Sequence, residues 1–172
     1  GMRWLLNFDV TTVLDNLSRS TVMMGVPTYY TRLLADHRFT ARQCASMRLF
    51  ISGSAPLLAE TFVEFERRTG YAILERYGMT ETGMNTSNPL HGLRRAGTVG
   101  LPLPGVVVRV CDADNRILGV NEVGALQVRG ANVFVGYWNM PEQTAQDFTP
   151  DGFFNTGDLA VIDDQGYVSI VG

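Results

Sequence analysis

Apolar residues in the first half of the chain alternate between helical and strand spacing. They recur at three- and four-residue intervals over Val10–Leu17, which predicts a helix with one apolar face. Thr21–Val26 and Met47–Ser52 are short apolar runs that predict two buried strands. Between them, Pro27 suits the first turn of a helix that runs to about Ala35. The pattern is therefore strand, helix, strand, as in a parallel βαβ unit.

A second helix follows over Leu57–Thr69 and is strongly amphipathic. Leu58, Phe62 and Phe65 face one way, and the charged residues of the segment face the other. The glycine that follows predicts a left-handed cap at the end of the helix. Ala72–Glu75 then begins another strand, which adds a second crossover to the parallel sheet.

The second half of the chain has short strands separated by turns. Val106–Cys111 and Ala125–Arg129 are predicted strands, and Pro141–Asp147 is a short predicted helix. Leu159–Ile162 and Tyr167–Val171 flank a polar turn and predict a β-hairpin. We expect this half to form a small β-rich subdomain with a distorted, barrel-like shape.

The fold class is therefore α/β, with a partial parallel βαβ subdomain over residues 1–92 and the β-rich subdomain over residues 93–172. Proline and glycine gather near residues 88–97, where we place the boundary. Three parallel strands cannot form a sheet that is covered on both faces. The open sheet edge favours self-association, for example as a homodimer.

Composition narrows the classes of function. The 172 residues include 14 Lys and Arg and 17 Asp and Glu, so the net charge is −3. No basic block is present, and the charge pattern therefore does not indicate nucleic acid as a partner. Cys44 and Cys111 lack the spacing of a disulfide framework or a zinc site. No run reaches the roughly 18 apolar residues of a membrane span. The opening residues do not resemble a signal peptide, so we expect a cytoplasmic protein, with an organelle lumen as the alternative.

One stretch carries a dense set of chemical groups, Glu75-Arg76-Tyr77-Gly78-Met79-Thr80-Glu81. It follows a predicted strand and is expected at the carboxyl end of the parallel sheet, where open α/β sheets bind ligands. Tyr77 can stack on a flat base, Thr80 can donate to a phosphate oxygen, and Glu81 can hold Mg²⁺. Gly78 permits close approach. A plain strand-to-loop turn explains the same residues if the stretch is taken alone.

Two further stretches have candidate chemistry. Ser52-Gly53-Ser54-Ala55-Pro56 lies between a strand and a helix, where free backbone N–H groups favour a polar or anionic ligand. Asn155-Thr156-Gly157-Asp158 ends in an aspartate that can accept two hydrogen bonds from a vicinal diol such as a ribose. Each of these stretches also has an ordinary interpretation as a turn.

Together, the three stretches occur in the order and approximate spacing of the ATP-dependent adenylate-forming superfamily, which includes acyl-CoA synthetases. Thr98-Val99-Gly100-Leu101-Pro102 and Gly136-Tyr137-Trp138 match its connecting segments. The resemblance covers nearly the whole chain. The version Glu75–Thr82, with Gly25–Arg32 upstream, is most similar to malonyl-CoA synthetases.

The resemblance implies a role for each matching residue. Gly53, Ser54, Ala55 and Pro56 would line the adenine pocket, on which Tyr77 would stack, with Gly78 beside it. The catalytic pair would be Thr80 at the α-phosphate and Glu81 at the magnesium ion, and Asp158 would bind the ribose hydroxyls.

Arg76 departs from the common pattern of the superfamily, in which relatives with apolar acyl substrates carry a small residue before the tyrosine. A guanidinium there fits a dicarboxylic acid, because it can pair with the distal carboxylate in a fork. Arg32 is a second candidate for this contact, with a solvated helix residue as its alternative.

The resemblance implies ATP, Mg²⁺ and coenzyme A as cofactors and a small acid as substrate. The family's phosphate-binding loop and the small C-terminal domain with its catalytic lysine have no match in the 172 residues. We therefore expect a fragment that ends just before the hinge and is inactive alone. The alternatives are a non-catalytic, self-associating module and an acyl-CoA synthetase for a different acid.

Overall fold

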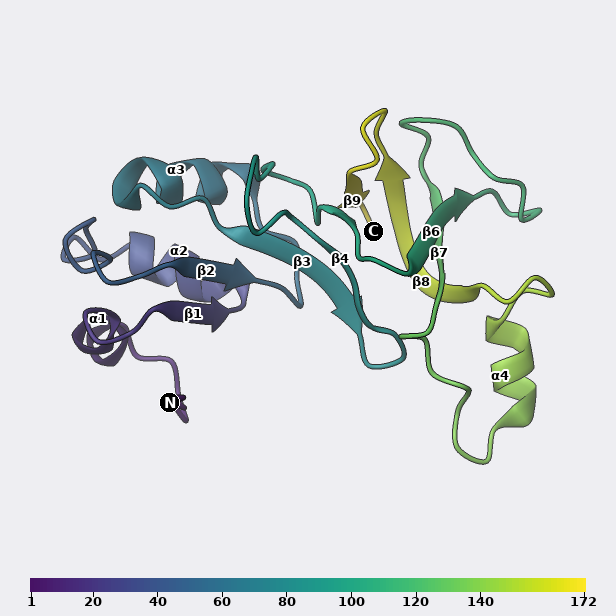
Figure 1. The fold of residues 1–172 in the computed structure, drawn as a ribbon, viewed down its shortest axis with the longest axis horizontal. Coiled ribbons are helices and arrows are strands. Elements are labelled where there is room, and N and C mark those ends of the chain that lie inside the picture. Colours follow the sequence, from purple (N-terminus) through teal and green to yellow (C-terminus); the bar gives the residue numbers. More distant parts are fainter. The chain divides into compact units, whose positions relative to one another are not determined.

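The computed structural model describes residues 1–172, and their contacts divide the chain into two units. Unit 1 is Gly1–Leu74 and unit 2 is Glu75–Gly172. Figure 1 shows that helices and strands alternate in unit 1, whereas unit 2 consists mainly of strands.

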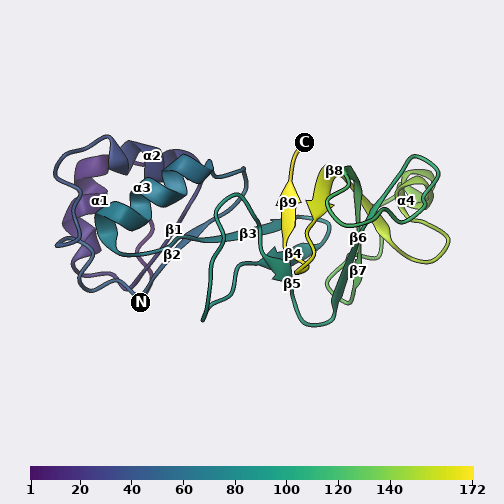
Figure 2. The ribbon, with the colours of Figure 1, turned by 90° about the horizontal axis from the view of Figure 1, so that it is seen from above.

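Unit 1 contains the parallel crossover that the apolar pattern predicts. Strands β1 and β2 pair in parallel, with Val22 opposite Leu49 and Gly25 opposite Ser52. Three helices gather around these strands (Figure 2). The elements are α1 (Val10–Leu17), β1 (Val22–Gly25), α2 (Pro27–Leu34), β2 (Leu49–Ser52) and α3 (Ala59–Thr69).

Phe65 of α3 is the centre of the core of unit 1. Its ring lies 4.9 Å from Phe50 of β2 and 5.4 Å from Tyr30 of α2, edge-on in both cases. The Tyr30 hydroxyl donates to the Ile51 carbonyl at 2.6 Å and so ties α2 to β2. Buried aromatic rings contribute large apolar areas, so this cluster fixes both helices against the strands.

The start of α3 differs from the prediction by two residues. The helix begins at Ala59, so Leu58 precedes it and is exposed, whereas Leu57 is buried. The expectation that Leu58 shares the buried face was therefore wrong. Gly70 caps the other end with a φ of 79°, as predicted.

The longest helix, α3, has 11 residues. No helix of the chain is long and apolar enough to cross a bilayer.

Unit 2 is built from antiparallel ladders. The strand order is β3-β4-β5 in one ladder and β6-β7-β8-β9 in the other. The elements are β3 (Leu74–Met79), β4 (Gly83–Ser87), β5 (Leu101–Pro102), β6 (Val106–Cys111), β7 (Gly124–Gly130), α4 (Pro141–Asp147), β8 (Phe154–Ile162) and β9 (Val168–Ile170).

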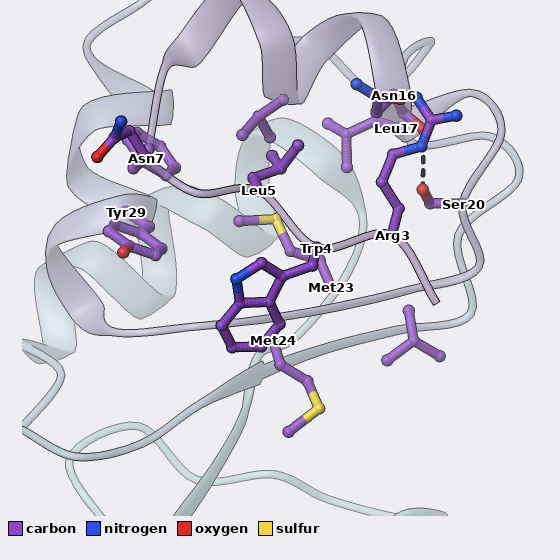
Figure 3. A pocket seen from close by; sticks show the side chains of 13 residues that line it. Arg3, Trp4, Leu5, Asn7, Asn16, Leu17, Ser20, Met23, Met24 and Tyr29 are labelled. Carbon is purple, nitrogen blue, oxygen red and sulfur yellow. Dashed lines mark hydrogen bonds between the residues drawn. The ribbon is translucent and has the colours of Figure 1, made fainter. Parts of the chain in front are cut away.

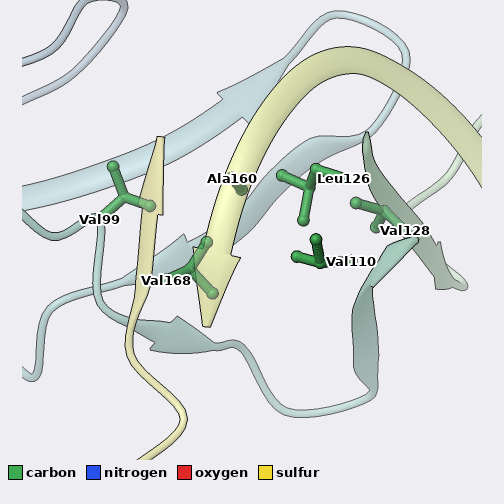
Figure 4. Packing of buried hydrophobic residues seen from close by; sticks show 6 residues of the cluster. All are labelled: Val99, Val110, Leu126, Val128, Ala160 and Val168. Atoms are coloured by element: carbon green, nitrogen blue, oxygen red, sulfur yellow. The ribbon is translucent and has the colours of Figure 1, made fainter. Parts of the chain in front are cut away.

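A short bridge joins the two ladders of unit 2. The Val99 N–H donates to the Val168 carbonyl at 2.8 Å, and the Val168 N–H donates to the Gly100 carbonyl at 2.9 Å. Around the bridge lies an apolar cluster whose buried members belong to β6–β9, apart from Val99 in the segment before β5 (Figure 4). Its buried members are Val99, Val110, Leu126, Val128, Ala160 and Val168.

The fold class is confirmed as α/β, with a partly parallel first part and a curled antiparallel second part. β6 and α4 have the predicted bounds, and the β8–β9 hairpin pairs as expected. β4 was not predicted, because its sequence, Gly83–Ser87, carries no apolar run. The contacts group residues 75–92 with the second half, and the division of the chain at residue 92 stays a prediction.

Gly100 is a position where the bridge tolerates no side chain. Its φ is +85°, and a Cβ atom there would lie 2.0 Å from the Asn88 nitrogen. We expect Gly100→Ala to lower the free energy of unfolding by about 2 kcal/mol more than Gly97→Ala, as measured by urea unfolding. Gly97 is the matched control, since its φ is also positive, at +73°, but its Cβ would meet nothing within 4 Å. Equal losses for the two variants would show that the close approach at Gly100 has no energetic role.

Candidate functional site

Tyr77 lies within a strand rather than in a loop after one. β3 extends to Met79 and pairs with β4, with Tyr77 opposite Thr86. Tyr77 therefore belongs to the strand itself and not to the segment after it, while its expected position at the carboxyl end of the parallel sheet stays a prediction. The register of the ladder shifts between Tyr77 and Gly78, and a Cβ on Gly78 would lie 2.0 Å from the Gly83 carbonyl oxygen. Gly78 thus permits the close turn into β4.

Asp158 projects from a β-bulge in β8. Gln127 pairs with Asn155 and Ala125 pairs with Leu159, so Thr156, Gly157 and Asp158 stand opposite the single residue Leu126 of β7. Gly157 has a φ of +82°. The buried Thr156 hydroxyl holds the bulge, because it donates to the Leu126 carbonyl at 2.9 Å and accepts from the Asp158 N–H at 3.2 Å. Bulges re-aim side chains in this way near active sites.

The structure brings Tyr77 and Asp158 together, although 81 positions separate them. The Tyr77 hydroxyl donates a short hydrogen bond to Oδ2 of Asp158. The ring itself packs against the apolar cluster of unit 2. Burial raises the pKa of the Tyr77 hydroxyl, and the Asp158 carboxylate raises it further. The phenol is therefore protonated and acts as a donor at neutral pH.

The turn between β3 and β4 carries Thr80 and Glu81, which a neighbouring segment holds in place. The Phe134 N–H donates to the Glu81 carbonyl at 2.7 Å. Nδ2 of Asn132 donates to the Thr82 carbonyl at 2.7 Å and to Oδ1 of Asn85 at 3.1 Å. Thr82 and Asn85 are fully buried, so these bonds satisfy acceptors that water does not reach.

The side chains on this turn suit a phosphate with a magnesium ion. Thr80 is exposed and offers a hydroxyl, and Glu81 offers a carboxylate one residue away. Burial raises the pKa of Tyr137, and the Asp147 and Glu81 carboxylates close to its hydroxyl add to this effect. Mg²⁺ prefers hard oxygen donors and takes one or two carboxylates together with phosphates. The donor set therefore fits the ion, with Glu81 as the carboxylate to hold it.

The two candidate arginines lie in different units. Arg76 is half-buried in β3 opposite Ser87, and it takes part in none of the salt bridges of the chain. Arg32 is exposed on α2, with its guanidinium carbon 4.9 Å from the centre of the Phe8 ring. Neither guanidinium group forms a salt bridge with a carboxylate of the chain, so each can pair with the carboxylate of an acid substrate.

The loop between β2 and α3 contains Gly53, Ser54, Ala55 and Pro56, in unit 1. Ser54 has a φ of +68°, which is rare for a residue with a side chain. The buried hydroxyl of Ser52 has no hydrogen-bond partner, and no side chain caps the N-terminus of α3. The loop thus presents polar groups at a helix start, as the sequence predicts. Its assignment to an adenine pocket stays a prediction.

Unit 1 also contains a cavity of about 280 Å³ whose lining includes none of the candidate site residues (Figure 3). It is bounded by the first residues of the chain, α1, β1 and Tyr29. Trp4, Met23 and Met24 contribute much of its apolar lining. This cavity is therefore not the predicted nucleotide site.

Sequence reasoning assigned no role to Asn132 or Thr156, although Thr156 lies in one of the three candidate stretches. Both residues hold segments that carry candidate side chains in position. Asn132 lies two residues after the end of β7, and Thr156 precedes the Gly157-Asp158 pair. An asparagine beside a strand end and a threonine before a glycine are weak signals, because both are common in turns. Their roles follow only from the pairing of distant strands.

Comparison with known proteins gives a consistent result. The sequence profile of the AMP-binding enzyme family matches residues 6–138. A malonate–CoA ligase of Arabidopsis thaliana is 42% identical over 181 aligned residues, which cover 99% of this chain and 29% of that protein. The chain thus spans about a third of the length of the relatives it matches.

Solved structures agree with this result. ATP-bound MatB from Rhodopseudomonas palustris superimposes with a TM-score of 0.96 and 56% identity, over 98% of this chain and 34% of that one. A malonyl-CoA ligase in complex with methylmalonyl-CoA and AMP gives a TM-score of 0.84 and 46% identity, over 96% of this chain and 36% of that one.

The contacts of Asn132 predict how the turn responds to its loss. Asn132→Asp places an oxygen where Nδ2 now donates, so it repels the Thr82 carbonyl and Oδ1 of Asn85. We expect the Phe134 amide, which bonds to Glu81, to exchange its hydrogen about tenfold faster. Amide hydrogen exchange followed by NMR measures this rate. The control is Asn139→Asp, because Asn139 is exposed in the same segment. Unchanged exchange at Phe134 in Asn132→Asp would mean that Asn132 does not hold the turn.

Proposed function

Since the chain belongs to the AMP-binding enzyme family, we propose that it carries the nucleotide-binding and acid-binding residues of an adenylate-forming acid–CoA ligase. The observation that supports this most strongly is the contact between Tyr77 and Asp158. An aromatic ring and a carboxylate held side by side suit a nucleoside, because the ring can stack on a base while the carboxylate accepts from ribose hydroxyls.

Each side chain has a separate part in this proposal. Tyr77 stacks on adenine with Gly78 beside it, and Asp158 accepts from the ribose hydroxyls. Thr80 donates to the α-phosphate, and Glu81 holds the magnesium ion. Gly53, Ser54, Ala55 and Pro56 are assigned to adenine on the resemblance alone. ATP, Mg²⁺ and coenzyme A are thus the cofactors of the reaction that we propose.

The chemistry suits residues that orient reactants and stabilise charge. In the first step, an oxygen of the acid attacks the α-phosphorus of ATP, and pyrophosphate leaves. In the second step, the sulfur of coenzyme A attacks the acyl carbon, and AMP leaves. In this proposal the Thr80 hydroxyl stabilises negative charge on the α-phosphate during the first step. Magnesium supplies charge neutralisation at the phosphates when it is bound.

The proposed acid is a short dicarboxylate such as malonate. Arg76 supports this choice, because its guanidinium takes part in no intramolecular salt bridge. A dicarboxylate has a distal carboxylate that does not react, and a free guanidinium can pair with it. The relatives named as malonate–CoA and malonyl-CoA ligases support it as well. Arg32 is proposed as a second contact to the acid.

Nucleotide binding is the first test of the proposal. We expect the 172-residue chain to bind AMP in calorimetry, and we expect Tyr77→Ala and Asp158→Ala each to weaken binding about tenfold or more, through lost stacking and lost hydrogen bonds. Asp164→Ala is the control, since Asp164 is exposed in the hairpin of the same sheet. Absence of binding at millimolar AMP would contradict the proposal. We also expect no pyrophosphate release from ATP and malonate by these residues alone.

Acid preference is the second test, in a longer protein that includes these 172 residues. We expect Arg76→Gly to lower kcat/KM for malonate about tenfold to a hundredfold while kcat/KM for propionate changes little, because only malonate has a distal carboxylate. The control is Arg116→Gly, whose side chain is 76% exposed. Activity assays with the two acids measure the ratio. An unchanged ratio would point to a different acid substrate.

A further inference from the structure

The Tyr77 hydroxyl makes a contact that stacking on a base does not require. Its bond to Oδ2 of Asp158 is the only hydrogen bond that the Asp158 carboxylate receives from the chain. We propose that this hydroxyl is a positioning group that aims the Asp158 carboxylate at the two ribose hydroxyls and so sets selectivity for a ribonucleotide. This inference rests on the proposed function, because it concerns the same nucleotide.

Tyr77 is a fixed anchor for this purpose. Its backbone is paired with Thr86 of β4 on one side, and its ring packs against the apolar cluster of unit 2. Because strand pairing and core packing hold the ring, it cannot shift when the Asp158 side chain moves. The position of the hydroxyl is therefore set by the fold, and the Asp158 carboxylate adapts to it.

The Asp158 carboxylate needs such an anchor. It projects from the bulge at Thr156–Asp158, where the β7–β8 ladder is interrupted, and its side chain is half-exposed. The torsion that turns a carboxylate about its last bond has broad minima, so packing alone sets its plane poorly. The Thr156 hydroxyl accepts from the Asp158 N–H and fixes only the backbone. One hydrogen bond to Oδ2 therefore decides where the remaining lone pairs point.

The carboxylate retains enough acceptor capacity for the diol. Its two oxygens offer about four acceptor positions, of which the Tyr77 hydroxyl uses one. Two ribose hydroxyls can therefore bind while the Tyr77 bond persists. Binding then costs less conformational entropy, because the carboxylate is already oriented before the nucleotide arrives.

The experiment compares AMP with 2′,3′-dideoxy-AMP on the 172-residue chain by calorimetry. Tyr77→Phe removes the hydroxyl and keeps the ring. We expect Tyr77→Phe to weaken AMP about five- to tenfold and to leave 2′,3′-dideoxy-AMP unchanged, because only AMP has the diol that Asp158 receives. Tyr167→Phe is the matched control, since the Tyr167 hydroxyl bonds to the Leu93 carbonyl in the same unit; it should change neither affinity.

The remaining outcomes overturn the inference in distinguishable ways. If Tyr77→Phe weakens the affinity for both nucleotides equally, the hydroxyl has a general structural role. If it does not weaken the affinity for AMP, the hydroxyl has no positioning role. Both results leave the proposed function standing. Failure of the unaltered chain to bind either nucleotide would instead overturn the proposed function together with the inference.

Discussion

The hydrogen bond between Tyr77 and Asp158 is the constraint on which the candidate site depends. It joins two strands that are far apart along the chain, β3 and β8, and it places a ring and a carboxylate side by side. Both residues stand at irregularities in their ladders, the register shift after Tyr77 and the bulge that contains Asp158. Regular strands alternate their side chains strictly, so these irregularities give the two side chains directions that perfect pairing would not.

The rest of unit 2 supports this pair. The bridge between Val99, Gly100 and Val168 joins the two ladders, and the apolar cluster fills the space around it. Asn132 and the Phe134 amide hold the turn that carries Thr80 and Glu81 next to β3. The candidate residues are thus carried by paired strands and by a turn with buried hydrogen bonds. Such a frame can keep charged and polar groups in place without a large movement on binding.

Sequence reasoning reached the elements that apolar periodicity specifies. The bounds of β6 and the buried face around Phe65 follow from that pattern, and the start of α4 follows from Pro141. It failed at β4, whose residues are mostly polar and form a strand only because β3 and β5 pair with it. For the same reason it placed Tyr77 after the predicted strand that begins at Ala72 and not within it. Only the family resemblance assigned Tyr77 and Asp158 to the same nucleotide, and their hydrogen bond was not predicted. The contacts of Asn132 had no local signal, since hydrogen bonds between distant segments leave no period in the sequence.

The central claim is that a nucleotide binds where Tyr77 and Asp158 meet. An NMR titration of the isotopically labelled 172-residue chain with AMP tests it most directly. The account predicts that the largest amide shifts fall on residues 76–81 and 155–158. Shifts confined to the cavity lined by Trp4 and Met24, or spread evenly over the chain, would contradict it.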